Sequence, residues 1–253
     1  MQISSQSALV AGGGSGIGAA VAKHLAGLGA KVAVLDVNPD GARATAQEIG
    51  GIAIECDIAS AQSAEQAIAQ ARDDHGPARI LVNCAGILST GRILGKDGPL
   101  SLDLFRRVIE VNLIGAFNLL RLAAADMATL APLADGERGV VINTASIAAY
   151  EGQIGQIAYA TSKAGMAGMT LPAARDLARH GIRVLSVAPG LVATPMLTNL
   201  PQDMQDALAQ SIPFPQRLAD PGEVARLVQH MIENVMLNGA VVRLDGALRM
   251  PPK

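Results

Sequence analysis

The sequence predicts an α/β protein with one doubly wound parallel sheet of about seven strands and helices on both faces. Three observations lead to this fold class. Short runs of Val, Ile, Leu and Ala alternate with longer segments of helical periodicity along the whole chain. The short runs are continuously apolar, as in parallel strands that helices cover on both sides. No linker, repeat or low-complexity tract divides the 253 residues, so we expect a single domain spanning 1–253.

Seven apolar runs are the expected strands. They are short and rich in Val, Ile and Leu, which is typical of buried strands. In chain order they are 7–10 (SALV), 31–35 (KVAVL), 51–55 (GIAIE), 80–83 (ILVN), 139–144 (GVVINT), 183–188 (RVLSVA) and 241–244 (VVRL).

Six longer segments between these runs carry apolar residues at helical spacing. Each would connect two parallel strands and cover one face of the sheet. In chain order they are 17–28, 40–49, 60–75, 101–128, 157–179 and 221–232.

Two segments have neither periodicity. Residues 88–100 are rich in glycine, and residues 191–217 contain four prolines. Ligands bind outside the carboxyl ends of the strands in open α/β sheets, and 191–217 directly follows the sixth strand. We therefore expect 191–217 to form a lid over a substrate, although a plain surface loop fits the sequence about as well.

Composition argues against several classes of partner. The net charge of -2 lacks the excess of Lys and Arg that nucleic-acid binding needs, and aromatic residues, at 2%, are too few for base stacking. A strand near the N-terminus leaves no room for a signal peptide, and Asn112, Arg121 and Asp126 interrupt the most apolar stretch, so no membrane span is expected. Cys56 and Cys84 lack metal-ligand spacing and predict reduced thiols in a cytoplasmic protein without a metal site.

A glycine cluster at 11–18 (AGGGSGIG) joins the first strand to the first helix. Glycines let a backbone turn tightly and approach a pyrophosphate, and the helix N-terminus directs free N–H groups at phosphate. This position is the context that a dinucleotide-binding turn of the Rossmann type requires. The alternative is a tight turn without a ligand.

Asp36 ends the second expected strand, about 20 residues after the glycine cluster. An acidic side chain there accepts hydrogen bonds from the ribose hydroxyls of adenosine and repels a 2′-phosphate. The nearest downstream cation, Arg43, lies inside the next helix. Asp36 therefore favours NAD over NADP. The alternative role is that of an N-cap for the helix that begins near Asp40.

Tyr159 and Lys163 lie four residues apart in a helical segment, so their side chains share one face. A phenol has a pKa of about 10, and a neighbouring ammonium lowers that pKa. Tyr159 is therefore a candidate general acid/base, and Ser146, at the end of the fifth strand, could bond the substrate oxygen. An isolated pair of this kind is otherwise an ordinary helix-surface pair. Tyr150, the other tyrosine, has no lysine at i+4.

Taken together, these spaced motifs resemble the short-chain dehydrogenase/reductase family over almost the full chain. The residues that carry the resemblance are Gly12, Gly16, Gly18, Asn83-Cys84-Ala85-Gly86, Asn112, Ser146, Tyr159, Lys163 and Pro189-Gly190. The resemblance implies an NAD-dependent oxidoreductase that moves a hydride between nicotinamide and a carbinol or carbonyl carbon.

The resemblance also implies four catalytic roles. Tyr159 would exchange the proton of the substrate oxygen, and Ser146 would hold that oxygen. Lys163 would lower the pKa of the tyrosine and bind the nicotinamide ribose. Asn112 would anchor a water that relays protons to Lys163.

Cofactor contacts are implied along most of the chain. The Val192 backbone and Thr194 would bind the carboxamide, Asp57 would meet the adenine, and 83–86 would support the sheet beside the adenosine half. The full expected set is Gly12, Ser15, Gly16, Ile17, Gly18, Asp36, Asp57, Ile58, Asn83, Ala85, Gly86, Tyr159, Lys163, Pro189, Gly190, Val192 and Thr194.

One position departs from the family pattern. The family commonly has Thr where this chain has Ala11, and that hydroxyl braces the turn. We expect looser local packing at Ala11 but no loss of cofactor binding.

The C-terminal half is similar to one subgroup, the type II 3-hydroxyacyl-CoA dehydrogenases, also called type 10 17-beta-hydroxysteroid dehydrogenases. The similarity implies oxidation of short-chain (S)-3-hydroxyacyl-CoA to 3-oxoacyl-CoA, substrate contacts from Ser146, Gln156 and Tyr159, closure of 191–217 over the substrate, and a homotetramer. The matching stretches are 139–149, 151–153, 169–177, 212–218 and 232–251, with an insertion at 129–138.

Nothing in the sequence shows a coenzyme A site. Arg92, Lys96 and Arg217 could meet its phosphates, but solvated loop charges are the preferred interpretation because surface cations are common. The long helices 101–128 and 157–179 could build a subunit interface or be buried within one subunit.

Three other hypotheses stay open. An NAD-dependent dehydrogenase of steroids or bulky secondary alcohols would suit the apolar lid equally well. An NADPH-dependent 3-oxoacyl-carrier-protein reductase is disfavoured by Asp36. A non-catalytic scaffold is disfavoured by the intact catalytic set.

Overall fold

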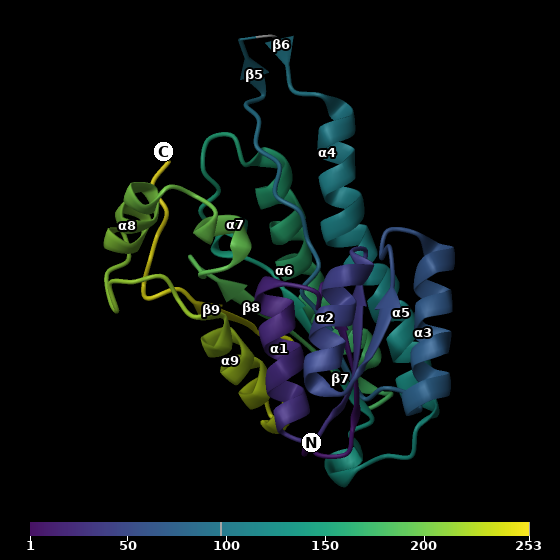
Figure 1. Ribbon diagram of the computed structural model, residues 1–253. Coiled ribbons are helices and arrows are strands. Elements are labelled where there is room, and N and C mark those ends of the chain that lie inside the picture. The colour runs from purple at the N-terminus through teal and green to yellow at the C-terminus, as the bar shows by residue number, and fades with distance from the viewer. Residues whose placement is uncertain (97, 253) are drawn as a thin grey trace.

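The structure is a computed structural model that describes residues 1–96 and 98–252. Seven parallel strands form one sheet in the order β3-β2-β1-β4-β7-β8-β9 (Figure 1). This confirms the predicted sheet. The strands are β1 (Ser7–Ala11), β2 (Lys31–Asp36), β3 (Ile52–Glu55), β4 (Ile80–Asn83), β7 (Gly139–Thr144), β8 (Ile182–Pro189) and β9 (Val241–Leu244).

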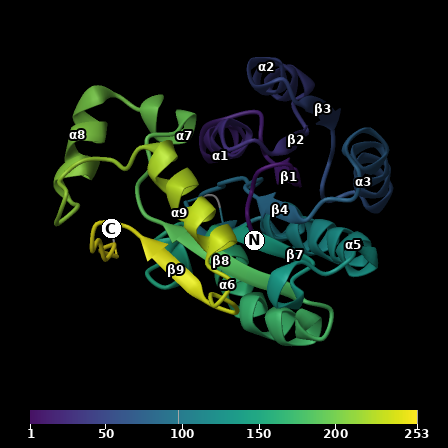
Figure 2. The ribbon, with the colours of Figure 1, turned by 90° about the horizontal axis from the view of Figure 1, so that it is seen from below.

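Helices cover both faces of the sheet, as Figure 2 shows in the view from below. One face carries α1 (Gly16–Gly27), α2 (Pro39–Ile49) and α9 (Pro221–Glu233). The opposite face carries α3 (Ala61–His75), α5 (Ala116–Thr129) and α6 (Ile157–Ala178). Helix α4 (Leu102–Ile109) packs against α6. The strand order reverses between β1 and β4, and a crevice opens at the carboxyl ends of strands at such a switch point.

Neighbouring residues of each strand enter two separate cores because side chains alternate across a strand. Val10 and Val82 pack with Leu25 of α1 on one face. Leu9 and Leu81 pack with Leu119 of α5 on the other. Both faces are therefore apolar, which explains why the strands read as continuous apolar runs in the sequence.

The predicted helix 101–128 is more complex than expected. Between α4 and α5 the residues Glu110–Gly115 form a π-helical turn. The whole segment Leu102–Thr129 has 28 residues and a mean hydropathy of 1.5 over its most apolar window, enough by length and composition to cross a membrane. Half of that window is buried in the fold, as in a core helix of a globular domain.

The lid segment 191–217, expected to be irregular, contains α7 (Pro195–Thr198) and α8 (Gln202–Gln210). Pro195 is in the first turn of α7, and Pro201 is the N-cap of α8. Proline fits these positions because the first helical N–H groups have no partner in the helix. Two of the four prolines therefore start helices, and the expectation of irregular structure was wrong for α7 and α8 and correct for the rest of the segment.

Within the predicted irregular segment 88–100, the described residues 88–96 and 98–100 are irregular except for a small hairpin at the top of Figure 1, and residue 97 lies outside the described residues. Its strands are β5 (Leu94–Gly95) and β6 (Gly98–Pro99). Two single 3-10 turns lie at Ala134–Gly136 and Ile147–Ala149.

Candidate active site

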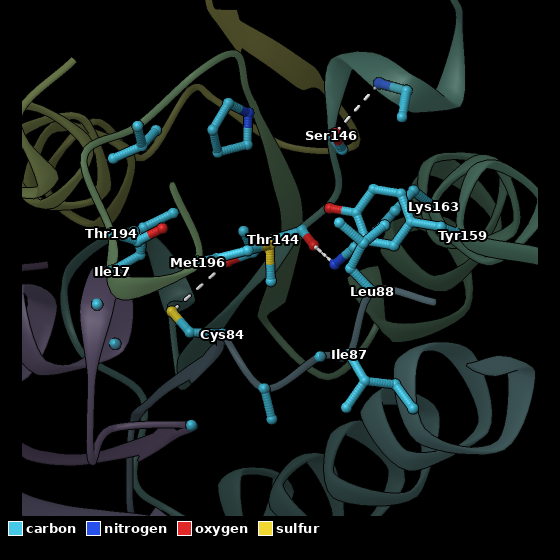
Figure 3. Close-up of a pocket in the computed structure, with 18 of the residues that line it drawn as sticks. Ile17, Cys84, Ile87, Leu88, Thr144, Ser146, Tyr159, Lys163, Thr194 and Met196 are labelled. Carbon is cyan, nitrogen blue, oxygen red and sulfur yellow. Dashed lines mark hydrogen bonds between the residues drawn. The ribbon is translucent and has the colours of Figure 1, made fainter. Parts of the chain in front are cut away.

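A cavity of about 600 Å³ opens at the carboxyl ends of the strands. Figure 3 shows part of its lining, with side chains converging from the strand ends, α6 and the start of the lid. Most of the predicted site residues line it: Gly12, Ser15, Gly16, Ile17, Gly18, Asp36, Asp57, Ile58, Ala85, Gly86, Ser146, Gln156, Tyr159, Lys163, Pro189, Gly190, Val192 and Thr194.

The turn from β1 to α1 requires glycine at two positions. Gly12 has a φ of +71°, and a Cβ there would overlap the Ala85 backbone nitrogen. A Cβ at Gly18 would overlap the carbonyl oxygen of Gly12. These contacts hold the turn tightly against the end of β4 and the start of α1.

Helix α1 directs its N-terminus into the cavity. Its N-cap residue, Ser15, makes no side-chain cap hydrogen bond, and its first turn contains no acidic residue. The first N–H groups of a helix lack intrahelical partners and attract anions. The cradle around residues 12–18 therefore fits the pyrophosphate of a dinucleotide.

Asp36 is fixed at the adenosine end of the expected cofactor site. Its Oδ2 accepts a hydrogen bond from the Gly14 N–H at 2.9 Å, and its Oδ1 accepts one from Asn38 N–H at 2.9 Å. The N-cap of α2 is Asn38, which accepts from Asp40 and Gly41 N–H groups. The capping role weighed for Asp36 in the sequence therefore belongs to Asn38.

Tyr159, Lys163 and Ser146 meet in the middle of the cavity (Figure 3). The Lys163 ammonium donates a hydrogen bond to the Thr144 carbonyl oxygen at 2.6 Å and lies 5.7 Å from the centre of the Tyr159 ring. The Ser146 hydroxyl accepts from the Ala148 N–H at 3.1 Å. One strand end and one helix face thus hold all three groups.

Burial shifts the pKa values of Lys163 and Tyr159 in opposite directions. It lowers the pKa of Lys163 to about 8, because the ammonium is almost completely buried. Burial raises the pKa of Tyr159, and the Ser146 side chain partly offsets that rise. From the sequence, Lys163 is expected to lower the pKa of Tyr159. In the protein without ligands, burial outweighs any such effect, and the phenol stays protonated at neutral pH.

Asn112 lies in the π-helical turn and is fully buried. Its Oδ1 accepts from Ile87 N–H at 2.8 Å, and its amide donates to the Ile87 carbonyl oxygen at 2.9 Å and to the Ser162 hydroxyl at 3.0 Å. The Ser162 hydroxyl in turn donates to the Tyr159 carbonyl oxygen at 2.7 Å. Asn112 therefore joins α6 to the segment after β4, and its predicted water-anchoring role stays a prediction.

Asn83 also lies outside the cavity lining. Its buried amide donates to the Ala116 carbonyl oxygen and to Asn143, which ties β4 to β7 and α5. Any support that it gives the cofactor is indirect.

The start of the lid reaches the cofactor side of the cavity. A Cβ at Gly16 would lie 3.2 Å from the Thr194 methyl group, so the lid packs on the first turn of α1. The Thr194 N–H donates to the Val192 carbonyl oxygen at 2.7 Å. The Val192 N–H donates no hydrogen bond within residues 1–96 and 98–252, so it is available to a ligand.

The three loop cations considered for coenzyme A do not line this cavity within the described chain. Arg217 forms two hydrogen bonds with Glu223, at 2.8 and 2.9 Å. Arg92 and Lys96 are exposed near the hairpin. Arg107 of α4 lines the cavity instead, and no sequence motif singles it out.

The predicted lid 191–217 contributes four apolar side chains to the cavity: Leu191, Met196, Leu197 and Leu208. Sequence reasoning missed Gln153 and Met250, which line the cavity from distant segments that no local pattern marks.

Cys56 and Cys84 line the cavity as free thiols. Burial raises the pKa of each to about 11, which keeps both protonated and unreactive. Among the described residues, no group of His, Cys, Asp and Glu is arranged to hold a metal ion.

Comparison with known proteins agrees with this geometry. The family model for short chain dehydrogenases matches residues 6–205. The chain is 49% identical to human 3-hydroxyacyl-CoA dehydrogenase type-2, over 97% of this chain and 95% of that protein. It is 38% identical to human (3R)-3-hydroxyacyl-CoA dehydrogenase, over 96% of this chain and 95% of that one. The crystal structure of 3-hydroxyacyl-CoA dehydrogenase type-2 from Mycobacterium avium superposes with a TM-score of 0.92 at 40% identity, covering 98% and 97% of the two chains.

Proposed function

The chain belongs to the short-chain dehydrogenase family, and we propose that it is an NAD-dependent 3-hydroxyacyl-CoA dehydrogenase. The reaction would interconvert short-chain (S)-3-hydroxyacyl-CoA and 3-oxoacyl-CoA. One observation carries the proposal. A single cavity holds the glycine turn, Asp36 and the Tyr159–Lys163 pair, in a chain similar to proteins named 3-hydroxyacyl-CoA dehydrogenase type-2.

The residues around the cavity fit NAD. The N–H groups at the start of α1 would hold the pyrophosphate, and the Asp36 carboxylate would accept from the ribose hydroxyls. Lys163 would bind the nicotinamide ribose, and the Val192 N–H and Thr194 would bind the carboxamide. Bound NAD supplies the acceptor for a hydride from the carbinol carbon.

Tyr159 would move the proton. In the direction of reduction, its protonated phenol donates to the substrate oxygen while the Ser146 hydroxyl bonds the same oxygen. In the direction of oxidation, the phenol must first lose its proton. Because burial raises the pKa of Tyr159, positive charge close to the phenol is needed for that loss. The Lys163 ammonium is the protein group placed to provide it.

The substrate end of the cavity suits an apolar chain, because Leu191, Met196, Leu197 and Leu208 line it. This lining also fits a steroid or another bulky secondary alcohol, which stays as the second candidate function. A carrier-protein reductase that uses NADPH is disfavoured, because a 2′-phosphate would meet the Asp36 carboxylate. A scaffold role is disfavoured by the complete catalytic set.

The test is steady-state oxidation of NADH with acetoacetyl-CoA, repeated with NADPH and with a 17-oxosteroid. We expect kcat/KM to be highest for acetoacetyl-CoA with NADH. The product should be the (S)-3-hydroxyacyl-CoA, which chiral analysis separates from the (R) product named for one of the relatives. A higher kcat/KM for the steroid would favour the second candidate, and a preference for NADPH would overturn the cofactor assignment.

A further inference from the structure

The eight residues after β9, 245–252, form a segment that returns to the cavity; we name it the tail segment. It begins with a tight turn in which Gly246 has a φ of +58° and Ala247 a φ of +65°. The Asp245 carboxylate accepts from the Ala247 N–H at 3.0 Å, and the Leu248 N–H donates to the Asp245 carbonyl oxygen at 3.0 Å. This turn reverses the chain and directs Met250 into the cavity.

Ion pairs fix the tail segment on the N-terminal side of Met250. Arg243 donates two hydrogen bonds of 2.8 Å to the Glu151 carboxylate and one of 2.6 Å to Asp245. Arg243 also donates to the Leu248 carbonyl oxygen at 3.0 Å, and Arg249 donates to Asp245 at 3.1 Å. Paired charge-assisted bonds of this kind hold a backbone in one place.

Two hydrogen bonds to backbone carbonyl oxygens fix the tail segment on the C-terminal side of Met250. The Gln153 amide donates to the Pro251 carbonyl oxygen at 3.2 Å, and the Ile154 N–H donates to the Pro252 carbonyl oxygen at 3.0 Å. Met250 is therefore held between two anchored positions.

The tail segment also packs against the end of the lid. Leu248 forms a small core with Ile147 and Ile212, and Met250 packs at its edge. A Cβ at Gly246 would overlap Ile212, and the Phe214 N–H donates to the Gly246 carbonyl oxygen at 3.2 Å. The lid and the tail segment thus share one contact next to the substrate end.

We propose that Met250, anchored through the Arg243–Glu151 pair, is the wall that limits the length of the acyl chain. This inference rests on the proposed function, because it assigns a substrate preference to the same cavity. Met250 lines the cavity with Leu208 and Gln156. The Gln156 amide donates to the Gln153 side-chain oxygen at 3.3 Å, and the Gln153 amide donates to the Pro251 carbonyl oxygen, so hydrogen bonds connect Gln156 to the residue after Met250. We therefore place Met250 at the Gln156 side of the cavity, where it would meet a long acyl chain. Because the ion pairs fix the backbone on one side of Met250, a longer chain cannot gain room by displacing the tail segment as a whole.

The experiment measures kcat/KM with NADH for 3-oxoacyl-CoA of 4, 6, 8 and 10 carbons. Wild type should lose activity as the chain lengthens. Met250→Ala should raise the ratio of 10-carbon to 4-carbon activity at least tenfold, because each methylene that gains an apolar contact adds about fourfold in affinity. Met250→Phe should lower that ratio. Met236→Ala, at an exposed methionine outside the cavity lining, is the matched control and should leave it unchanged.

The anchor is tested by Glu151→Gln, with Glu151→Asp as the conservative variant. Loss of the Arg243–Glu151 pair should make kcat/KM depend less on chain length, while kcat for the 4-carbon substrate stays within about twofold of wild type. Glu151→Asp should restore part of the chain-length selectivity. A merely structural role would lower activity equally at every length. An identical profile in wild type, Met250→Ala and Met250→Phe would overturn the proposal.

Calorimetric binding of saturated acyl-CoA of the same lengths separates this proposal from the proposed function, because it needs no turnover. If no 3-oxoacyl-CoA reacts but Met250→Ala still shifts the binding preference to longer chains, the proposed function fails and the wall remains. If Met250→Ala leaves binding of every length unchanged, the wall is refuted whatever the enzyme turns over.

Discussion

Individual side chains in the cofactor half are held in position by the backbone. Two N–H groups fix the Asp36 carboxylate, and the Thr144 carbonyl oxygen fixes the Lys163 ammonium. Asn112 is held by both backbone groups of Ile87. Such fixed groups do not have to reorganise when a ligand binds, which favours tight and selective binding.

Cofactor choice is predicted to depend on the charge of Asp36. Asp36→Asn keeps the size of the side chain but removes the charge that repels a 2′-phosphate. The ratio of kcat/KM for NADPH to that for NADH should rise about tenfold to a hundredfold, the range expected for losing bonds to a charged group. Asp40→Asn, at an exposed residue paired with Arg43, is the control. An unchanged ratio would remove Asp36 from the specificity argument.

The buried lysine predicts an alkaline rise in stability. The pKa of Lys163 is about 8 in the fold and about 10.5 in the unfolded chain. Between these values the unfolded chain binds more protons, so the Lys163 contribution to the free energy of unfolding grows as pH rises and is lost as pH falls toward 8. The total should be on the order of 3 kcal/mol. Burial of the Cys56 and Cys84 thiols, which raises the pKa of each to about 11, acts in the opposite sense above about pH 9, and burial of the Tyr159 phenol does so above about pH 10. The Lys163 contribution is therefore the difference between wild type and a variant that lacks the lysine.

Urea denaturation of the cofactor-free protein at pH 7, 8, 9 and 10 measures this effect. Wild type should gain stability relative to Lys163→Met across the series. Lys23→Met, at a partly exposed lysine, should follow wild type. Parallel curves for wild type and Lys163→Met would contradict the depressed pKa.

The two ends of strand β8 contribute to different parts of the molecule: one to the cavity and one to a buried ion pair. Pro189, at its carboxyl end, lines the cavity. Arg183, near its start, is buried and donates to Glu137 at 2.8 Å and to the carbonyl oxygens of Met231 and Ile232 at the end of α9. This places a structural charge pair at the opposite edge of the sheet from the chemistry.

Arg183→Met should therefore lower the free energy of unfolding without changing the chemistry. Removing one partner of a buried ion pair costs up to about 3–5 kcal/mol. Glu137 keeps its second partner, the Met1 ammonium at 2.8 Å, so we expect a loss of about 3 kcal/mol, the lower end of that range. Activity per folded molecule should stay within about twofold of wild type. Arg179→Met, next to the end of α6, is the exposed control. Equal stability of the two variants in urea would show that the pair contributes nothing.

At the level of elements, periodicity predicted all seven strands of the main sheet and the helices between them. It failed where helices are short or irregular. Pro195 is the first residue of α7, and Pro201 is the N-cap of α8. Four prolines in one segment suggest a loop unless their position at a helix start is taken into account. A π-helical turn adds one residue to a helix and leaves the spacing of the apolar residues almost intact. The sequence therefore does not distinguish the turn Glu110–Gly115 from the α-helices on either side of it.

For the whole molecule, the two halves of the site differ in how far the sequence predicts them. The cofactor half consists of short motifs at strand ends, and the fold class alone brings Asp36, Ser146 and Lys163 to one edge of the sheet. The substrate half depends on tertiary packing. Met250 follows the last strand, and Leu208 lies on a helix of the lid, so no local signal connects them.

Assembly is predicted at the same scale. We propose a homotetramer, because the long helices keep large apolar side chains exposed: Leu102, Ile114, Phe117, Ile157 and Leu171. Sedimentation equilibrium should give the mass of four chains, and Phe117→Glu should reduce it. Leu94→Glu, on the hairpin, is the control and should leave the mass unchanged. A monomeric wild type would refute the assembly, and the expected cytoplasmic location stays a prediction.

Tyr159 is proposed to move the proton in an NAD-dependent reduction of 3-oxoacyl-CoA. The most direct test is kcat for acetoacetyl-CoA with NADH in wild type and Tyr159→Phe, with NADH affinity measured by fluorescence in both. The variant should lose about 10²–10⁴-fold in kcat, the usual contribution of a general acid, while it binds NADH as wild type does. Tyr150→Phe, at the tyrosine outside the cavity lining, should behave as wild type. Turnover by Tyr159→Phe at the wild-type rate would contradict the role of Tyr159 as the general acid/base.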